Sequence, residues 1–200
     1  MLSMLVISRQ LVNNELQDNV GGYMAQNGET PLVGIVMGSD SDLPIMRSAG
    51  DTLELFDVDY EYGIKSAHRT PDRMMKYGHE AVARGLQVII AGAGGSAHLQ
   101  GMLASETRLP VLGVAIESSV DPLSSAFGSM VRMPEGAPLA TMGKNKAGAV
   151  NAALEAVRIL ALSSPQLAEQ YEEWMRRQAS EVEAKDARLR ELGVDAYLLQ

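Results

Sequence analysis

Short apolar segments alternate along this chain with segments in which apolar residues recur at the spacing of a helix. The apolar segments lie at residues 32–38, 58–64, 86–95, 110–116 and 137–142. The first of them is a continuous apolar run that ends in glycine, as expected for a strand buried on both faces. The segments with helical spacing lie at residues 39–57, 70–85, 96–107, 124–132 and 144–162. This alternation predicts an α/β fold in which a central parallel sheet carries helices on both faces.

The two ends of the chain depart from this alternation. Residues 1–31 are polar and contain many turn residues, which predicts a flexible N-terminal extension with a short helix near residues 8–18. Residues 32–162 form the predicted α/β domain. Residues 163–200 form a separate C-terminal segment, in which one long charged helix begins at Pro165.

Small and hydroxyl-bearing residues follow three successive predicted strands. The first strand ends in "GSDSD" (38–42), the second in "SAHRT" (66–70) and the third in "AGAGGSAHLQG" (91–101). The carboxyl ends of parallel strands meet at one edge of a sheet, where ligands of such folds bind. The three loops therefore predict one site, which contains two of the three histidines of the chain.

The first loop combines a glycine with the N-terminus of a predicted helix. Gly38 lets a ligand approach the backbone, and Ser39, Ser41 and Asp42 lead into a helix N-terminus, which favours anions. Plain N-capping by Ser41 or Asp42 explains the same residues equally well. The loop is not an NTPase phosphate loop, because no Gly-Lys-Ser/Thr follows it.

The second and third loops each carry a histidine. Thr70 and Pro71 are ordinary helix-start residues, but that explanation leaves Ser66, His68 and Arg69 without a role. The third loop is a glycine-rich turn ahead of His98, and it lacks the spacing of a dinucleotide-binding fingerprint. His79 lies in the middle of a predicted helix, where a structural role is expected.

Five segments stand in order over residues 32–162, namely "GIVMGSDSD", "SAHRTPDRM", "VIIAGAGGSAHLQGMLAS", "LPVLGV" and "KAGAVNAAL". Together they resemble the class I N5-carboxyaminoimidazole ribonucleotide mutases of purine biosynthesis. The resemblance implies a flavodoxin-like three-layer sandwich, an octameric assembly, and conversion of N5-carboxyaminoimidazole ribonucleotide into 4-carboxy-5-aminoimidazole ribonucleotide. The stretch "SAHRTP" favours the mutases over the related class II carboxylases, in which "SAHKGP" is typical.

The resemblance also implies roles for individual residues. His68 matches the catalytic histidine of the family, and the other matching positions bind the ribonucleotide. Ser39 and Asp42 match its ligand-binding serine and aspartate, and Ser66, with Ala67 beside it, and Arg69 match its phosphate contacts. The loop that faces the base is matched by Gly92, Ala93, Gly94, Gly95 and His98.

Three regions depart from the family pattern. Residues 115–145 follow it only loosely, with "VRMPEG" where "VQMPRG" is common. Gln100 stands where a proline is common. Residues 1–31 have no counterpart in the family core.

The implied reaction moves a carboxyl group from an exocyclic nitrogen to a ring carbon. One histidine can deliver a proton to the nitrogen and remove one from the carbon, because its ordinary pKa lies near neutrality. No cofactor is expected: the carbamate is already activated, so ATP is not needed, and two separated histidines make a poor metal site. Two alternatives remain, namely direct carboxylation of aminoimidazole ribonucleotide and a non-catalytic nucleotide-binding module on the same fold.

Composition and charge exclude several other classes of function. Hydrophobic residues make up 46% and charged residues 21% of the chain, which is ordinary for a globular protein. The net charge of −8 argues against nucleic-acid binding. No apolar run approaches the ~20 residues of a membrane span, and the start lacks the features of a signal peptide, so a cytoplasmic enzyme without membrane partners is expected.

The C-terminal segment carries one apolar stripe. Leu167, Tyr171, Trp174 and Met175 fall on one face of the predicted helix. The stripe either packs against its own domain or contacts a neighbouring subunit. The second interpretation, supported by small residues in "AGAVNAAL" that permit close helix approach, predicts a homo-oligomer much larger than a dimer.

Overall fold

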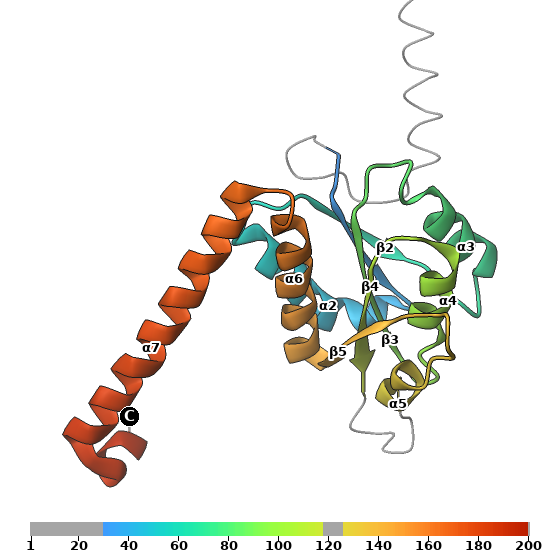
Figure 1. Cartoon of the computed structure of the whole chain (residues 1–200). Coiled ribbons are helices and arrows are strands. Elements are labelled where there is room, and N and C mark those ends of the chain that lie inside the picture. The colour runs from blue at the N-terminus through green and yellow to red at the C-terminus, as the bar shows by residue number, and fades with distance from the viewer. Residues whose placement is uncertain (1–29, 118–125, 200) are drawn as a thin grey trace, which may run out of the picture. The chain divides into compact units, whose positions relative to one another are not determined.

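The computed structural model describes residues 30–117 and 126–199 (Figure 1). The described residues fall into two compact units, which are divided between Ala156 and Val157. Nearly all of the predicted N-terminal extension, including the short helix expected near residues 8–18, lies outside the described residues. In the part that is described, no helix is both long enough and apolar enough to cross a membrane.

The first unit contains a five-stranded sheet with the order β2-β1-β3-β4-β5. All neighbouring strands are parallel, and this is the strand order of flavodoxin-like folds. The strands are β1 (Val33–Met37), β2 (Tyr60–Ile64), β3 (Val88–Gly94), β4 (Val111–Ile116) and β5 (Ala140–Lys144). The five predicted strands and their parallel arrangement are therefore confirmed.

Helices cover both faces of this sheet and make the three layers that were predicted. Helix α2 and the first part of α6 lie on one face, and α3, α4 and α5 lie on the other (Figure 1). The 3-10 turn η1 (Asp40–Asp42) precedes α2; the helices are α2 (Leu43–Glu54), α3 (Pro71–Glu80), α4 (His98–Glu106), α5 (Ala126–Val131) and α6 (Asn145–Ala161). Every residue of β1 and β4 is buried, because both faces of these central strands are covered.

Helix α3 is shorter than predicted. The apolar pattern suggested a helix up to residue 85, but the helix ends at Glu80 and residues 81–85 form turns. The last of these turns uses Gly85, whose φ of 92° is a left-handed conformation that glycine adopts without strain. This turn lets the chain enter β3.

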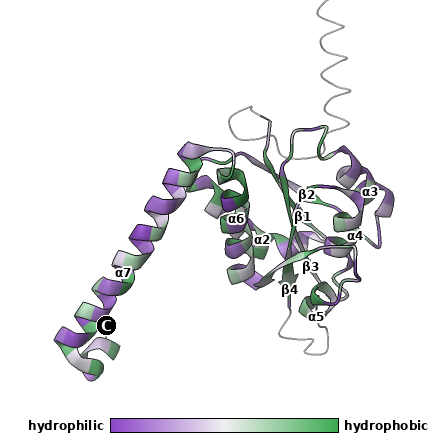
Figure 2. Cartoon of the chain, viewed as in Figure 1, coloured by the Kyte–Doolittle hydropathy of each residue, from purple (hydrophilic) through white to green (hydrophobic). Residues whose placement is uncertain are grey.

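The second unit contains α7 (Pro165–Leu198), the long C-terminal helix that was predicted. The Ser164 hydroxyl accepts a hydrogen bond from the Leu167 N–H at 3.3 Å and caps its start. The helix is mostly hydrophilic, in contrast to the strands of the first unit (Figure 2). Met175 and Val182 are nevertheless exposed on it, and Gly193 interrupts it with a φ of 72°.

The small residues of α6 are buried by the first unit itself. Ala149, Ala152 and Ala153 are 0% exposed in the single chain, and a Cβ on Gly148 would lie 2.6 Å from the backbone of Gly143. These residues let α6 approach its own strands closely. These buried residues therefore do not support contact with a neighbouring subunit.

A buried polar cluster joins β2 to α3. Glu61 is 3% exposed, and its carboxylate accepts a hydrogen bond of 2.8 Å from the Tyr77 hydroxyl. The guanidinium of Arg84 pairs with the other carboxylate oxygen. Burial raises the pKa of Tyr77 well above its usual value, so Tyr77 acts as a neutral donor to a buried charge, which would be costly to leave unpaired.

We expect Tyr77→Phe to lower the free energy of unfolding by about 1–3 kcal/mol, because it leaves one buried carboxylate oxygen without its donor. Tyr60→Phe is the matched control, since Tyr60 donates to Glu54 at an exposed position; it should cost about 0–1 kcal/mol. Urea unfolding of both variants measures the difference. Equal losses of unfolding free energy in the two variants would contradict the stabilising role of the buried Glu61 cluster.

Candidate active site

Strand register brings the three predicted loops to the same level of the sheet edge. Met37 at the end of β1 is aligned with Ile64 of β2 and with Gly92 of β3. The turns after these strands enclose a cavity of about 420 Å³. Nine of the eleven predicted site residues line it, namely Ser39, Asp42, Ser66, Ala67, His68, Arg69, Ala93, Gly94 and His98.

The first turn is held by a reciprocal pair of hydrogen bonds. The Ser39 hydroxyl accepts from the Ser41 N–H at 3.3 Å, and the Asp42 carboxylate accepts from the Ser39 N–H at 3.1 Å. This is a capping box around the 3-10 turn. Ser39 caps the 3-10 turn, and Asp42 closes the box from the other side. Asp42 is also the N-cap residue of α2, as expected, but its side chain makes no capping hydrogen bond there, and Ser41 caps neither element.

Asp42 is a buried carboxylate, 8% exposed. Desolvation raises its pKa above the usual value, and the backbone N–H groups of Ser39 and Gly38 oppose this only in part. Asp42 therefore lines the cavity as a group whose negative charge is incompletely compensated by the protein. Such a group gains from a hydroxyl donor on a ligand.

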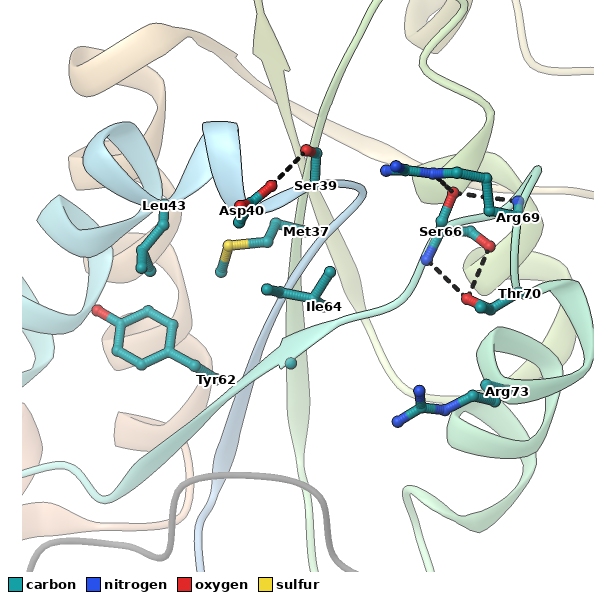
Figure 3. Close-up of a pocket in the computed structure, with 11 residues that line it drawn as sticks. Met37, Ser39, Asp40, Leu43, Tyr62, Ile64, Ser66, Arg69, Thr70 and Arg73 are labelled. Carbon is teal, nitrogen blue, oxygen red and sulfur yellow. Dashed lines mark hydrogen bonds between the residues drawn. The ribbon is translucent and has the colours of Figure 1, made fainter.

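The second turn arranges Ser66 and Arg69 beside the first turn (Figure 3). The Ser66 hydroxyl accepts from the Arg69 backbone N–H at 3.2 Å and from its side-chain Nε at 3.3 Å. The Arg69 Nη2 donates to the Gly38 carbonyl at 3.2 Å. Thr70 closes the turn, because its hydroxyl accepts from the Ser66 N–H at 3.1 Å. The guanidinium is thus held between two turns, where its remaining N–H groups suit an anion.

His68 and His98 meet across the cavity. The His68 Nε2 lies 2.8 Å from the His98 Nδ1, and the two ring planes are nearly perpendicular, at 86°. One nitrogen must carry the proton and the other must accept it, so this contact couples the tautomers of the two rings. Both side chains are exposed to the cavity and to solvent.

The third turn brings its backbone, rather than side chains, to the cavity. A Cβ on Gly94 would lie 2.7 Å from the Ile116 carbonyl, so only glycine fits there. The Ala97 N–H donates to the Gly94 carbonyl at 3.0 Å, and Ala97 adopts a left-handed φ of 47°. Together these contacts fold the turn tightly ahead of His98.

Gly92 and Gly95 are not among the residues that line this cavity. A Cβ on Gly92 would lie 2.2 Å from the Met46 sulfur, so this glycine makes room for the packing of α2. Gly95 has a φ of 58°, and a Cβ on it would meet no other atom within 4 Å, so this glycine serves the turn. The sequence could not distinguish these glycines from Gly94, because their roles depend on distant neighbours.

A second hollow of about 600 Å³ adjoins the cavity and shares Ser39, Ser66 and Arg69 with it (Figure 3). Tyr62 and Arg73 also line it, and sequence reasoning did not single them out. Arg69 lies in the turn before α3, and Arg73 lies in the first turn of the helix. Their spacing of four residues is therefore not a helical spacing, and no local pattern in the sequence marks Arg73.

Within residues 30–117 and 126–199, no three His, Asp or Glu side chains gather in a way that could hold a metal ion. The fold is that of a doubly wound α/β protein with a cavity at the carboxyl edge of its sheet, which is where ligands of such folds bind. The sequence profile of the AIR carboxylase family matches residues 32–181. The chain belongs to this family, which confirms the resemblance seen in its motifs.

Individual relatives agree with this assignment. The N5-carboxyaminoimidazole ribonucleotide mutase of Thermotoga maritima is 51% identical over 171 residues, which cover 85% of this chain and 98% of that protein. The phosphoribosylaminoimidazole carboxylase of Candida glabrata is 47% identical over 87% of this chain, but the match covers only 30% of that protein. The crystal structure of Treponema denticola PurE matches with a TM-score of 0.71 and 28% identity, covering 80% of this chain and 98% of that one.

We expect Asp42→Asn to remain folded, because the amide oxygen can still accept from the Ser39 N–H. A carboxyl whose folded pKa is raised contributes stability below its unfolded pKa and loses it as the pH rises through the folded pKa. The stability of the variant relative to the parent should therefore increase from about pH 4 to pH 7. Thermal unfolding across this range measures it, and a relative stability that falls with rising pH would contradict the burial effect.

Proposed function

We propose that this chain is an N5-carboxyaminoimidazole ribonucleotide mutase, which converts its substrate into 4-carboxy-5-aminoimidazole ribonucleotide in purine biosynthesis. The name and near-complete coverage of the Thermotoga maritima relative support the activity. The observation that carries the proposal is the position of His68. It shares one cavity with Ser66 and Arg69, whose donors suit an anion. We assign catalysis to residues 32–162.

The cavity offers complementary groups for each part of a ribonucleotide. Arg69 and the hydroxyls of Ser39 and Ser66 bind the phosphate, because charged and hydroxyl donors favour phosphate oxygens. The Asp42 carboxylate accepts hydrogen bonds from the ribose. The Ala93–Gly94 backbone, which has no bulky side chain, lies against the flat base beside His98.

His68 then serves as the acid and the base of the carboxyl transfer. It gives a proton to the exocyclic nitrogen as the carbamate C–N bond breaks and CO2 leaves. The electron pair of the ring carbon attacks the CO2 held in the cavity, and His68 takes back the proton that this carbon loses. Atoms and charge balance over the two steps, so no external reactant is consumed.

Direct carboxylation of aminoimidazole ribonucleotide is the second candidate, because the Candida glabrata relative is named as a carboxylase. A non-catalytic nucleotide-binding module is the third.

Assays with N5-carboxyaminoimidazole ribonucleotide, and separately with aminoimidazole ribonucleotide plus bicarbonate, distinguish all three candidates. We expect turnover with the first substrate without ATP and in the presence of EDTA. Turnover with the second substrate alone would favour the carboxylase, and no turnover with either would favour the binding module.

We expect His68→Asn to lower turnover by about 10²–10⁴-fold, because it removes the proton-transfer group and keeps the approximate shape. Ribonucleotide affinity should stay within about tenfold. The matched control is His79→Asn, since the His79 ring contacts Glu106 at 2.5 Å and does not line the cavity. A His68→Asn variant as active as the His79→Asn variant would remove His68 from the mechanism.

We expect Arg69→Ala to weaken the binding of a phosphorylated ligand by about 2–3 kcal/mol, the size of a charge-assisted hydrogen bond. Arg69→Lys should recover only part of this, because an ammonium group lacks the planar fork of donors. Arg47→Ala is the control, since Arg47 pairs with Asp51 at an exposed position. Titration calorimetry with aminoimidazole ribonucleotide measures all three affinities, and equal values would place the phosphate elsewhere.

We further propose that the enzyme is cytoplasmic and assembles as an octamer, with residues 163–200 contributing to the assembly. The exposed Met175 and Val182 of α7 support a partner for this helix. Light scattering should give a mass far above that of a dimer for the full chain and a smaller mass after deletion of residues 165–200. A monomeric full chain would refute the assembly, and an unchanged mass after deletion would refute the role of α7.

A further inference from the structure

Gln100 is a fully buried amide in the first turn of α4, 0% exposed. Its Nε2 donates to the Val114 carbonyl at 3.0 Å and to the Ala93 carbonyl at 3.3 Å. Only the NH2 end of the amide can face two carbonyl oxygens, so these two contacts determine the orientation of the side chain.

The oxygen end of the amide lowers the contribution of Gln100 to the stability of the fold. The Gln100 Oε1 is buried and has no hydrogen-bond partner among the described residues. A buried acceptor without a partner costs free energy, whereas an apolar side chain of the same size would avoid that cost. Stability alone therefore does not account for a glutamine at this position.

The two hydrogen bonds act on the backbone that lines the active-site cavity. The Ala93 carbonyl and the Gly94 N–H belong to the same peptide group, which is planar. A donor that holds the carbonyl therefore also sets the direction of the Gly94 N–H. Ala93 and Gly94 both line the cavity, on the side where the base is proposed to bind.

The same hydrogen bonds hold the start of α4. Its N-cap residue, Ala97, has a left-handed conformation and offers no side-chain cap. Gln100 ties this uncapped turn to the ends of β3 and β4 through Ala93 and Val114. His98 is the first residue of the helix, so the anchored turn carries the ring that contacts His68 at 2.8 Å.

We propose that Gln100 is a positioning residue of this active site, which holds the Ala93–Gly94 peptide and the His98 ring in place. Its effect on turnover rests on the proposed function, whereas its effect on the histidine pair does not. Gln100→Met is the informative variant, because it keeps the length and volume of the side chain and removes the donors. Gln100→Leu serves as a second variant if the methionine packs poorly.

The first measurement uses the full protein without ligand. Nitrogen-15 NMR of the ring nitrogens reports the tautomers of His68 and His98, and His79 serves as an internal reference. We expect Gln100→Met to change the signals of His68 and His98 and to leave those of His79 in place. Unchanged signals from the pair would overturn the proposal, whatever reaction the protein catalyses.

The second measurement compares activity with stability. We expect Gln100→Met to lower kcat/KM about tenfold while the melting temperature stays equal or rises. Leu103→Ala is the control, since Leu103 is a fully buried residue of the same helix outside the cavity lining; it should lower the melting temperature and keep kcat/KM. Parent-like kcat/KM in Gln100→Met would overturn the positioning role. So would a loss of activity accompanied by a fall in melting temperature as large as that of Leu103→Ala. A parent protein without turnover would refute the proposed function and leave the NMR measurement to decide on Gln100.

Discussion

The parallel register of β1, β2 and β3 is the constraint on which the rest of the structure depends. Alignment of Met37 with Ile64 and with Gly92 makes three strands end at one level. Each strand then continues into a turn whose polar groups have no place inside the sheet. A shift of one strand would separate Arg69 from the Gly38 carbonyl, which it contacts at 3.2 Å. The cavity is thus a consequence of strand pairing before any ligand binds.

The protein combines turns that are held by hydrogen bonds with buried polar groups whose charge or hydrogen-bonding capacity is only partly compensated. The capping box of Ser39 and Asp42 and the hydrogen bonds around Ser66 hold the backbone. The buried Asp42 carboxylate and the Gln100 oxygen each carry a cost in stability. Costs of this kind are typical of functional sites, where local groups are arranged for a ligand rather than for the fold.

The sequence predicted the strands, and most of the residues that line the cavity at their ends, for a physical reason. Strands buried on both faces are continuous apolar runs, and their ends are marked by the glycines and hydroxyl residues that the turns require. The finer assignments depended on tertiary contacts. Gly92 accommodates Met46 whereas Gly94 accommodates the Ile116 carbonyl, and no local pattern distinguishes these two cases. The residues around Gln100 likewise gave no hint that its amide would reach two strands.

The central claim is that this cavity moves a carboxyl group within one bound ribonucleotide. Substrate labelled with carbon-13 in its carboxyl group, supplied in buffer with unlabelled bicarbonate, tests this claim most directly. Mass spectrometry of the 4-carboxy product should show that the label is retained, because the released CO2 stays in the cavity until the ring carbon attacks it. A product whose carboxyl carbon comes from the unlabelled buffer would contradict the account.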